Sequence, residues 1–246
     1  MADERVFGLH AVEALLESSP EACRSLLVQS GLRGKVDAIL SLAQDAGVRV
    51  ERADKRELDR LSADANHQGV IARVDRQLTF SEGDLDALLA RSSGTPLILA
   101  LDGIQDPHNL GACLRTAEAF GVDVVIAPKD KACGITPVVR KVASGAAERI
   151  PFVPVVNLAR TLQSLKKSGL WVFGAAGEAG DPLHGADFSV PAVILMGAEG
   201  RGLRQRSRSL CDHLLAIPMH GDVGSFNVSV ACGIFLYEVI RQRGTP

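Results

Sequence analysis

The chain has 246 residues, of which 46% are hydrophobic and 23% charged, and its formal net charge is −2. This composition excludes a disordered chain, which needs low hydrophobicity and high net charge. The sequence has no run of about 18 apolar residues, and its N-terminus lacks a basic region followed by an apolar core. We therefore expect no membrane span, no signal peptide and a cytoplasmic location. The length corresponds to one large domain or two small ones.

Cysteine and histidine patterns exclude two further classes of site. The five cysteines are scattered without a CxxC pair, and the six histidines show no HExxH spacing. We expect neither a disulfide framework nor a metal site.

Charge is divided unevenly along the chain. Residues 1–95 carry 12 Lys and Arg against 16 Asp and Glu, whereas residues 96–246 carry 15 against 13. Neither part is as basic as a general nucleic-acid binder. Contacts with a polyanion would need local clusters, and the candidates are Arg201, Arg204, Arg206 and Arg208, and Lys129, Lys131, Arg140 and Lys141.

The first 75 residues alternate between helix and strand signals. Apolar spacing predicts helices over residues 10–17, 35–46 and 55–61, the second of them ended by Gly47. Short apolar runs predict strands over 25–28, 48–50 and 70–74. We predict a small α/β domain over 1–75, followed by a linker over 76–95 with a helix over 84–90 capped by Ser81.

From residue 96 the alternation is stronger. Strands are predicted over 97–101, 122–127, 171–175, 192–196 and 213–217, and helices over 109–120, 136–144, 158–167 and 228–242. This order predicts a second domain over 96–246, built on a parallel α/β sheet with helices on both faces.

Three polar segments follow predicted strands, where open α/β sheets bind ligands. In the first, Asn109 is placed to cap a helix, and Arg115 lies about one and two-thirds turns further on. A helix N-terminus with a nearby Arg favours an anion. The alternative is that Asn109 is only a cap and Arg115 only a solvated charge.

The other two segments have the same ambiguity. LMGAEGRGL places Glu199 in a glycine-rich loop, which either opens its backbone to a ligand or is an ordinary turn. In the third segment Ser225 or Asn227 caps a small-residue helix, which is either part of a site or a capped core helix. Neither GxSxG nor GxxxxGK[ST] occurs, so no hydrolase elbow or P-loop is indicated.

Together these segments resemble the three motifs of the SpoU class of RNA ribose 2′-O-methyltransferases in the SPOUT superfamily. The matching strings are DPHNLGACLRTAEAFGVDVVI, ILMGAEGRGL and IPMHGDVGSFNVSVACGIFLYEVIRQR, with VFGLHAVEALL and HQGVIARV resembling the accessory domain. The resemblance covers nearly the whole chain. Within the class it is closest to bacterial enzymes that methylate a guanosine ribose in the peptidyl-transferase P loop of 23S rRNA.

The resemblance implies several properties that spacing does not. The second domain would be an α/β trefoil knot, an exception to the rule that chains are unknotted, and the knot would form the S-adenosylmethionine (AdoMet) site. The protein would be a homodimer with this site near the interface. The first domain would resemble ribosomal-protein-like RNA-binding modules, and the substrate would be 23S rRNA or a pre-ribosomal particle, with no DNA, membrane or metal involved.

The same resemblance implies a set of site residues. The catalytic group would comprise Asn109, Arg115, Glu199, Ser225 and Asn227. The cofactor would be held largely by backbone around Leu195, Met196, Gly197, Gly200, Ile217 and Phe226. The chain departs from the usual Ser-Ser-Leu-Asn pattern at Gly224 and Phe226, and neither departure removes a proposed catalytic group.

Arg115 is the class's proposed activator of the ribose 2′-hydroxyl, which attacks the methyl group. Arginine is almost never deprotonated, which argues against a simple base. Our hypothesis is that Arg115 binds the substrate phosphate and stabilises the developing alkoxide.

Three alternatives stay open at this point. The methylated ribose could belong to tRNA or to another rRNA position. The protein could be an RNA-binding assembly or resistance factor without catalysis, or a general α/β nucleotide-binding protein that prefers NAD or ATP.

Overall fold

The computed structural model describes residues 4–62, 66–74, 80–92 and 94–244. They form two compact units, one from residues 1–79 with 135–149 and one from 80–134 with 150–246. Part of the predicted linker, residues 76–79 and 93, lies outside the described residues. The domain boundaries at 75 and 95 stay a prediction.

The first unit contains a four-stranded mixed sheet in the order β1-β4-β2-β3. Strands β1 and β2 run antiparallel to β4, and β3 runs parallel to β2. The strands are β1 (Glu4–Phe7), β2 (Cys23–Gln29), β3 (Arg49–Ala53) and β4 (Val70–Val74), and the helices are α1 (Leu9–Ser18), α2 (Val36–Asp45), α3 (Lys55–Leu61), α6 (Pro137–Ala143) and α7 (Ala146–Arg149).

Alternation along β2 explains the two-sided core of this unit. Leu26 and Val28 pack with the buried faces of α1 and α2, whereas Leu27 packs with Leu58 of α3. Gly47 follows α2 with φ +67°, which confirms its predicted place after the helix.

The second unit is built on a seven-stranded sheet in the order β7-β6-β5-β10-β8-β11-β9. Every pair of neighbouring strands is parallel, which confirms the predicted parallel sheet. The strands are β5 (Leu97–Asp102), β6 (Val124–Pro128), β7 (Phe152–Val155), β8 (Trp171–Ala175), β9 (Asp181–Pro182), β10 (Ala192–Gly197) and β11 (His213–Ala216).

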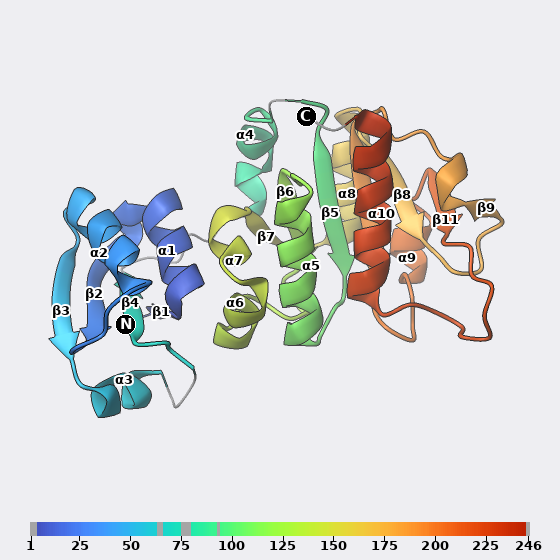
Figure 1. The fold of residues 1–246 in the computed structure, drawn as a ribbon. Helices are drawn as coiled ribbons and strands as arrows, with labels where there is room; N and C mark the ends of the chain where they lie inside the picture. The colour runs from blue at the N-terminus through green and yellow to red at the C-terminus, as the bar shows by residue number, and fades with distance from the viewer. Residues whose placement is uncertain (1–3, 63–65, 75–79, 93, 245–246) are drawn as a thin grey trace. The chain divides into compact units, whose positions relative to one another are not determined.

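Helices cover both faces of this sheet, as Figure 1 shows. On one face α5 packs along α10, and α10 also contacts β10. On the other, α4 and α8 cover β6, while α8 contacts β8 and α9. These helices are α4 (Leu85–Leu89), α5 (Pro107–Ala119), α8 (Leu158–Lys167), α9 (Gln205–Arg208) and α10 (Val228–Arg243).

The strand order brings distant parts of the chain to one edge of the sheet. From β5 the chain adds β6 and then β7 on one side of the sheet. It next forms β8 on the other side of β5, and β10 later inserts between β5 and β8. Because the strands are parallel, the segments after β8, β10 and β11 all leave from the same edge.

The first turn of α5 differs from the prediction. Asp106, and not Asn109, is the N-cap: its side chain accepts the His108 N–H at 2.9 Å, and Pro107 occupies the first helical position. Proline is favoured there because its missing N–H has no helical partner. Asn109 therefore lies within the helix, where its side chain is available for another contact.

Several short elements were absent from the sequence prediction, namely β1, β7, β9, α7 and α9. Their apolar signals are brief, and β7 contains Pro154. Within the described parts of the chain, no helix is both long and apolar enough to cross a bilayer.

Candidate active site

A cavity of about 780 Å³ lies at the edge of the second unit's sheet where β8, β10 and β11 end. Its walls come from the segment after β8, the glycine-rich loop after β10 and the segment leading into α10. The lining includes Met196, Gly197, Glu199, Gly200, Ile217, Ser225, Phe226 and Asn227, and also Ala175, Glu178, Met219 and Phe235.

The glycine-rich loop folds back tightly on the end of β10. A Cβ on Gly197 would lie 2.2–2.4 Å from backbone atoms of Gly202 and Leu203, a distance that real Cβ atoms do not show. Gly200 and Gly202 have φ of +71° and +62°, the left-handed region that favours glycine. The glycines thus make the tight turn possible, and Gly197, Gly200 and Gly202 all line the cavity.

A buried carboxylate holds the far end of this loop. Asp102, at the end of β5, is 1% exposed, and its Oδ2 accepts the backbone N–H of Arg204 at 3.1 Å. The Arg204 guanidinium lies 3.4 Å from Asp102 Oδ1 and donates to the Lys131 carbonyl at 3.4 Å. Asp102 was not among the site residues predicted from the sequence. An acidic residue directly after a predicted buried strand is a pattern that could have pointed to it.

The Asn227 side chain joins all three sequence segments. Its Oδ1 caps α10 by accepting the Ser229 N–H at 2.9 Å and the Ser229 hydroxyl at 2.6 Å. Its Nδ2 donates to Asn109 Oδ1 at 3.0 Å and to Glu199 Oε1. Of the two residues predicted as alternative caps, Ser225 and Asn227, Asn227 is the N-cap of α10. Its side chain also connects the first turn of α5 to the glycine-rich loop.

The remaining predicted residues divide into two groups. Ser225 and Phe226 are exposed and line the cavity beside Ile217. Leu195 lies outside the lining, and its fully buried side chain packs into the core on the α8 side of the sheet. Only its backbone can therefore serve the site, and its role stays a prediction.

Arg115 lies apart from the cavity in the same chain. It is exposed on α5, six residues after the buried Asn109, and it is not among the lining residues. Six residues at 100° each place its side chain roughly 120° around the helix from Asn109. One copy of this unit therefore brings together four of the five predicted catalytic residues, but not Arg115.

Ion pairs occupy several of the predicted basic cluster residues. Arg204 pairs with Asp102, Arg208 with Glu178, and Arg140 with Glu148 in the first unit. Glu148 is buried, which raises its pKa even beside the Arg140 charge. These ion pairs join segments of the protein itself, so the three guanidinium groups are already partly engaged by carboxylates.

Two segments of the chain match known protein families. Residues 96–237 match the SpoU rRNA Methylase family, and residues 5–79 match a domain described as RNA 2′-O ribose methyltransferase substrate binding. The chain belongs to the SpoU rRNA methylase family. The predicted membership is thereby confirmed.

Individual SpoU relatives match over nearly the whole chain. The 23S rRNA (guanosine-2′-O-)-methyltransferase RlmB of Pseudomonas aeruginosa is 52% identical over 244 residues, covering 99% of this chain and 98% of the relative. The protein of the same name from Haemophilus influenzae is 46% identical, covering 98% of each. The solved structure of the SpoU methyltransferase AviRb from Streptomyces viridochromogenes in complex with AdoMet has a TM-score of 0.81 at 24% identity, covering 98% of this chain and 90% of that one.

Replacing Asn227 with Asp separates its two roles. Aspartate still accepts from Ser229 and is an equally good N-cap, but it loses the donor to Asn109 and puts a second carboxylate beside Glu199. We expect the free energy of unfolding in urea to fall by less than about 1 kcal/mol. We expect AdoMet affinity, measured by calorimetry, to fall at least about tenfold, or about 1.4 kcal/mol.

The matched control is Asn227→Ala, which loses the cap as well and should reduce both stability and affinity. Unchanged AdoMet affinity in Asn227→Asp would show that this side chain does not organise the cavity.

Proposed function

We propose that this protein transfers a methyl group from AdoMet to the 2′-oxygen of a guanosine ribose in 23S rRNA. The observation that carries the proposal is the Asn227 side chain, which joins Asn109 and Glu199 at a cavity lined by Ser225. These are the residues that the family resemblance assigns to catalysis. The relatives from Pseudomonas and Haemophilus, named for this reaction, match nearly the full chain and support the substrate.

The cavity fits AdoMet in size and chemistry. Its volume of about 780 Å³ falls within the range of small-molecule sites. Met196, Ile217 and Phe226 provide apolar wall for a purine, and the carboxylate of Glu199 complements the ammonium and sulfonium charges of AdoMet. When bound, AdoMet supplies a methyl group already activated on a sulfonium centre, so no metal is needed.

The chain's own residues then position the nucleophile and manage charge. Asn227 fixes Asn109 and Glu199 relative to the cavity, so the ribose meets a preorganised set of polar groups. Arg115 binds the substrate phosphate and stabilises the alkoxide that develops as the 2′-hydroxyl releases its proton to solvent. The 2′-oxygen gains the methyl group, and S-adenosylhomocysteine is the other product. DNA lacks this hydroxyl and is not a substrate.

The decisive test is transfer of labelled methyl from AdoMet to 23S rRNA in vitro, followed by mapping of the modified nucleotide. We expect one 2′-O-methylated guanosine, and no transfer to the matching DNA. Methylation of tRNA or of another rRNA position instead would show that the proposed substrate is wrong. Binding of RNA without AdoMet binding or transfer would contradict the enzyme assignment and favour a non-catalytic assembly factor.

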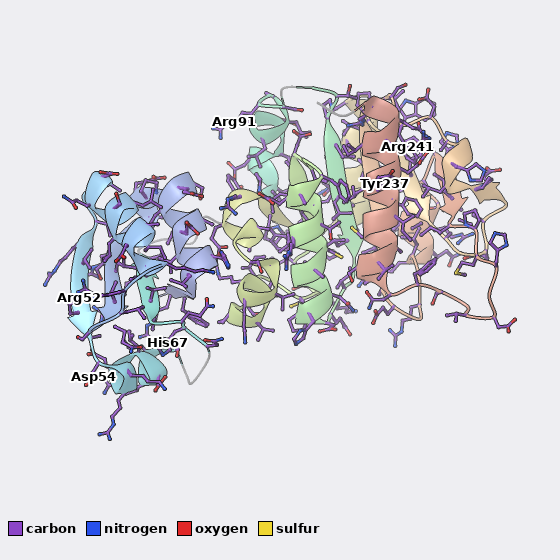
Figure 2. The ribbon with its side chains drawn as sticks, viewed as in Figure 1. Arg52, Asp54, His67, Arg91, Tyr237 and Arg241 are labelled. Carbon is purple, nitrogen blue, oxygen red and sulfur yellow. The ribbon has the colours of Figure 1, made fainter. Side chains whose placement is uncertain are left out.

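We further propose that the enzyme works as a homodimer in which each copy supplies Arg115 to its partner's cavity. Arg115 is exposed and lies outside the cavity of its own chain. On the neighbouring helix α10, Val230 and Tyr237 are 49% and 58% exposed and lie seven residues apart on one face. Figure 2 labels Tyr237 on this helix. A second copy docked here would cover this apolar stripe beside Arg115.

The family resemblance also supports a trefoil knot in the second unit, formed as the segment after β11 threads through a loop. The insertion of β10 between β5 and β8 is compatible with such a path. An rRNA or pre-ribosomal substrate supports a cytoplasmic location. We propose residues 1–75 as the RNA-binding domain and 96–246 as the methyltransferase domain, in line with the two family matches.

Mixing two inactive variants tests the shared site. Arg115→Ala keeps the cavity intact, and Asn227→Asp keeps Arg115 intact. If Arg115 acts across the interface, one of the two sites in a mixed dimer has both Arg115 and Asn227. If Arg115 acts within its own chain, neither site has both residues. Random mixing of equal amounts should restore about one quarter of wild-type methyl transfer, since half the dimers are mixed and each has one complete site.

Each variant alone is the control and should show little transfer. If mixing restores nothing while chromatography shows that mixed dimers form, Arg115 acts within its own chain.

A further inference from the structure

A second cavity of about 500 Å³ lies in the second unit, beside strands β8, β9 and β11. Trp171, Phe173, His213, Asp181 and Asp187 are among its lining residues. Leu215 lines both this cavity and the larger one, so the two lie close to each other. Nothing in the proposed methyl transfer uses this second cavity.

Its wall carries an exposed aromatic stack. The His213 ring lies 5.8 Å from Trp171 and 5.4 Å from Phe173 between ring centroids, at interplanar angles of 17° and 14°. Phe173 is buried against Phe188, whereas Trp171 is 46% exposed. The strand pairing of His213 with Phe173 fixes this arrangement, and it leaves a large flat ring open to a stacking partner.

Two carboxylates give the cavity a polar side. Asp187 Oδ1 accepts the Ser189 hydroxyl at 2.6 Å and the Ser189 N–H at 2.9 Å. These bonds lower the pKa of Asp187, so it is ionised near neutral pH. Carboxylates can only accept hydrogen bonds, so the Asp181 and Asp187 side chains favour a ligand edge that carries N–H donors and disfavour a phosphate.

The segment that bears Asp187 is held firmly by the last turn of α10. Gln242 donates to the Ala186 carbonyl at 2.9 Å and accepts the Phe188 N–H at 2.9 Å. Arg243 donates to the carbonyls of Phe188 and Val190 at 2.9 and 2.8 Å. The cavity wall is therefore fixed before any ligand arrives, which lowers the entropic cost of binding.

We propose that this second cavity binds an unpaired guanine base of the RNA substrate, stacked on Trp171 with its N1–H and amino group donated to the carboxylates. The inference rests on the proposed action on RNA. Single-stranded RNA is recognised by stacking on aromatic side chains and by hydrogen bonds to base edges. Guanine presents two adjacent donors on one edge, whereas uracil offers a single N–H.

The spacing along β8 places this base near the reacting ribose. Trp171 and Phe173 line the second cavity, and Ala175 lines the first. These alternate residues share one face of the strand, and Trp171 to Ala175 spans about 13 Å at 3.3 Å per residue. A single RNA segment can therefore reach both cavities, and the second base would help select which nucleotide is methylated.

Trp171 is the only tryptophan in the chain, so its fluorescence reports directly on this cavity. Protein saturated with S-adenosylhomocysteine, which fills the first cavity, would be titrated with guanosine, uridine and an arginine amide. We expect saturable quenching by guanosine and much weaker quenching by uridine. Quenching by the arginine amide but not by guanosine would overturn the proposal in favour of a cationic protein side chain.

Steady-state methyl transfer provides the second readout. Trp171→Ala should raise the KM for an RNA fragment about 5- to 150-fold, as expected for loss of one base stack, while kcat and AdoMet affinity stay within about twofold. Trp171→Phe, which keeps a ring, should retain most of the affinity. Asp181→Asn should reduce the preference for guanosine.

Val156→Ala is the matched control, because it removes an apolar side chain that is 71% exposed in the same unit and lines neither cavity. An unchanged KM in Trp171→Ala with normal wild-type methylation would overturn this inference alone. Absence of RNA methylation by the wild-type protein would instead overturn the proposed function.

Discussion

The site depends on one side-chain amide. Asn227 uses its oxygen to start α10 and its nitrogen to hold Asn109 and Glu199. Asparagine suits this place because it presents an acceptor and two N–H donors on one short side chain. Aspartate or serine can cap the helix, but neither can also donate two N–H bonds, one to Asn109 and one to Glu199.

The rest of the second unit brings the partners of Asn227 within reach. The parallel sheet delivers the segments after β5, β10 and β11 to one edge, although the end of β5 lies more than 90 residues before the end of β10 in sequence. Gly197 lets the loop carrying Glu199 fold back, and Asp102 holds the end of that loop through the Arg204 N–H. Loss of either constraint would leave Glu199 without a defined position.

Sequence patterns predicted the larger elements well, because amphipathic helices and buried strands have strong local signals. They predicted α8 and β8 at their observed bounds, and they narrowed the cap of α10 to Ser225 or Asn227, of which Asn227 is the observed cap. The cap of α5 was assigned to Asn109 because Asp106 and Asn109 are both good capping residues, and only the position of Pro107 in the first turn decides between them.

The tertiary contacts were beyond the reach of spacing. Nothing local shows that the Arg140 side chain is paired with a buried Glu148, or that Trp171 and His213, 42 positions apart, form a stack through neighbouring strands. The predicted catalytic residues came from resemblance to a family, and spacing alone left each of them open to a plain structural role. The structure adds the hydrogen bonds by which Asn227 joins Asn109 and Glu199.

A double-mutant cycle between Asn109 and Asn227 tests this central contact most directly. Asn227→Ser keeps a helix cap and removes the donor, and Asn109→Ala removes the acceptor. If the two side chains act as one unit, the double variant should lose little more methyl-transfer activity than either single variant, with a coupling energy of about 1 kcal/mol or more. Losses that simply multiply would contradict the account.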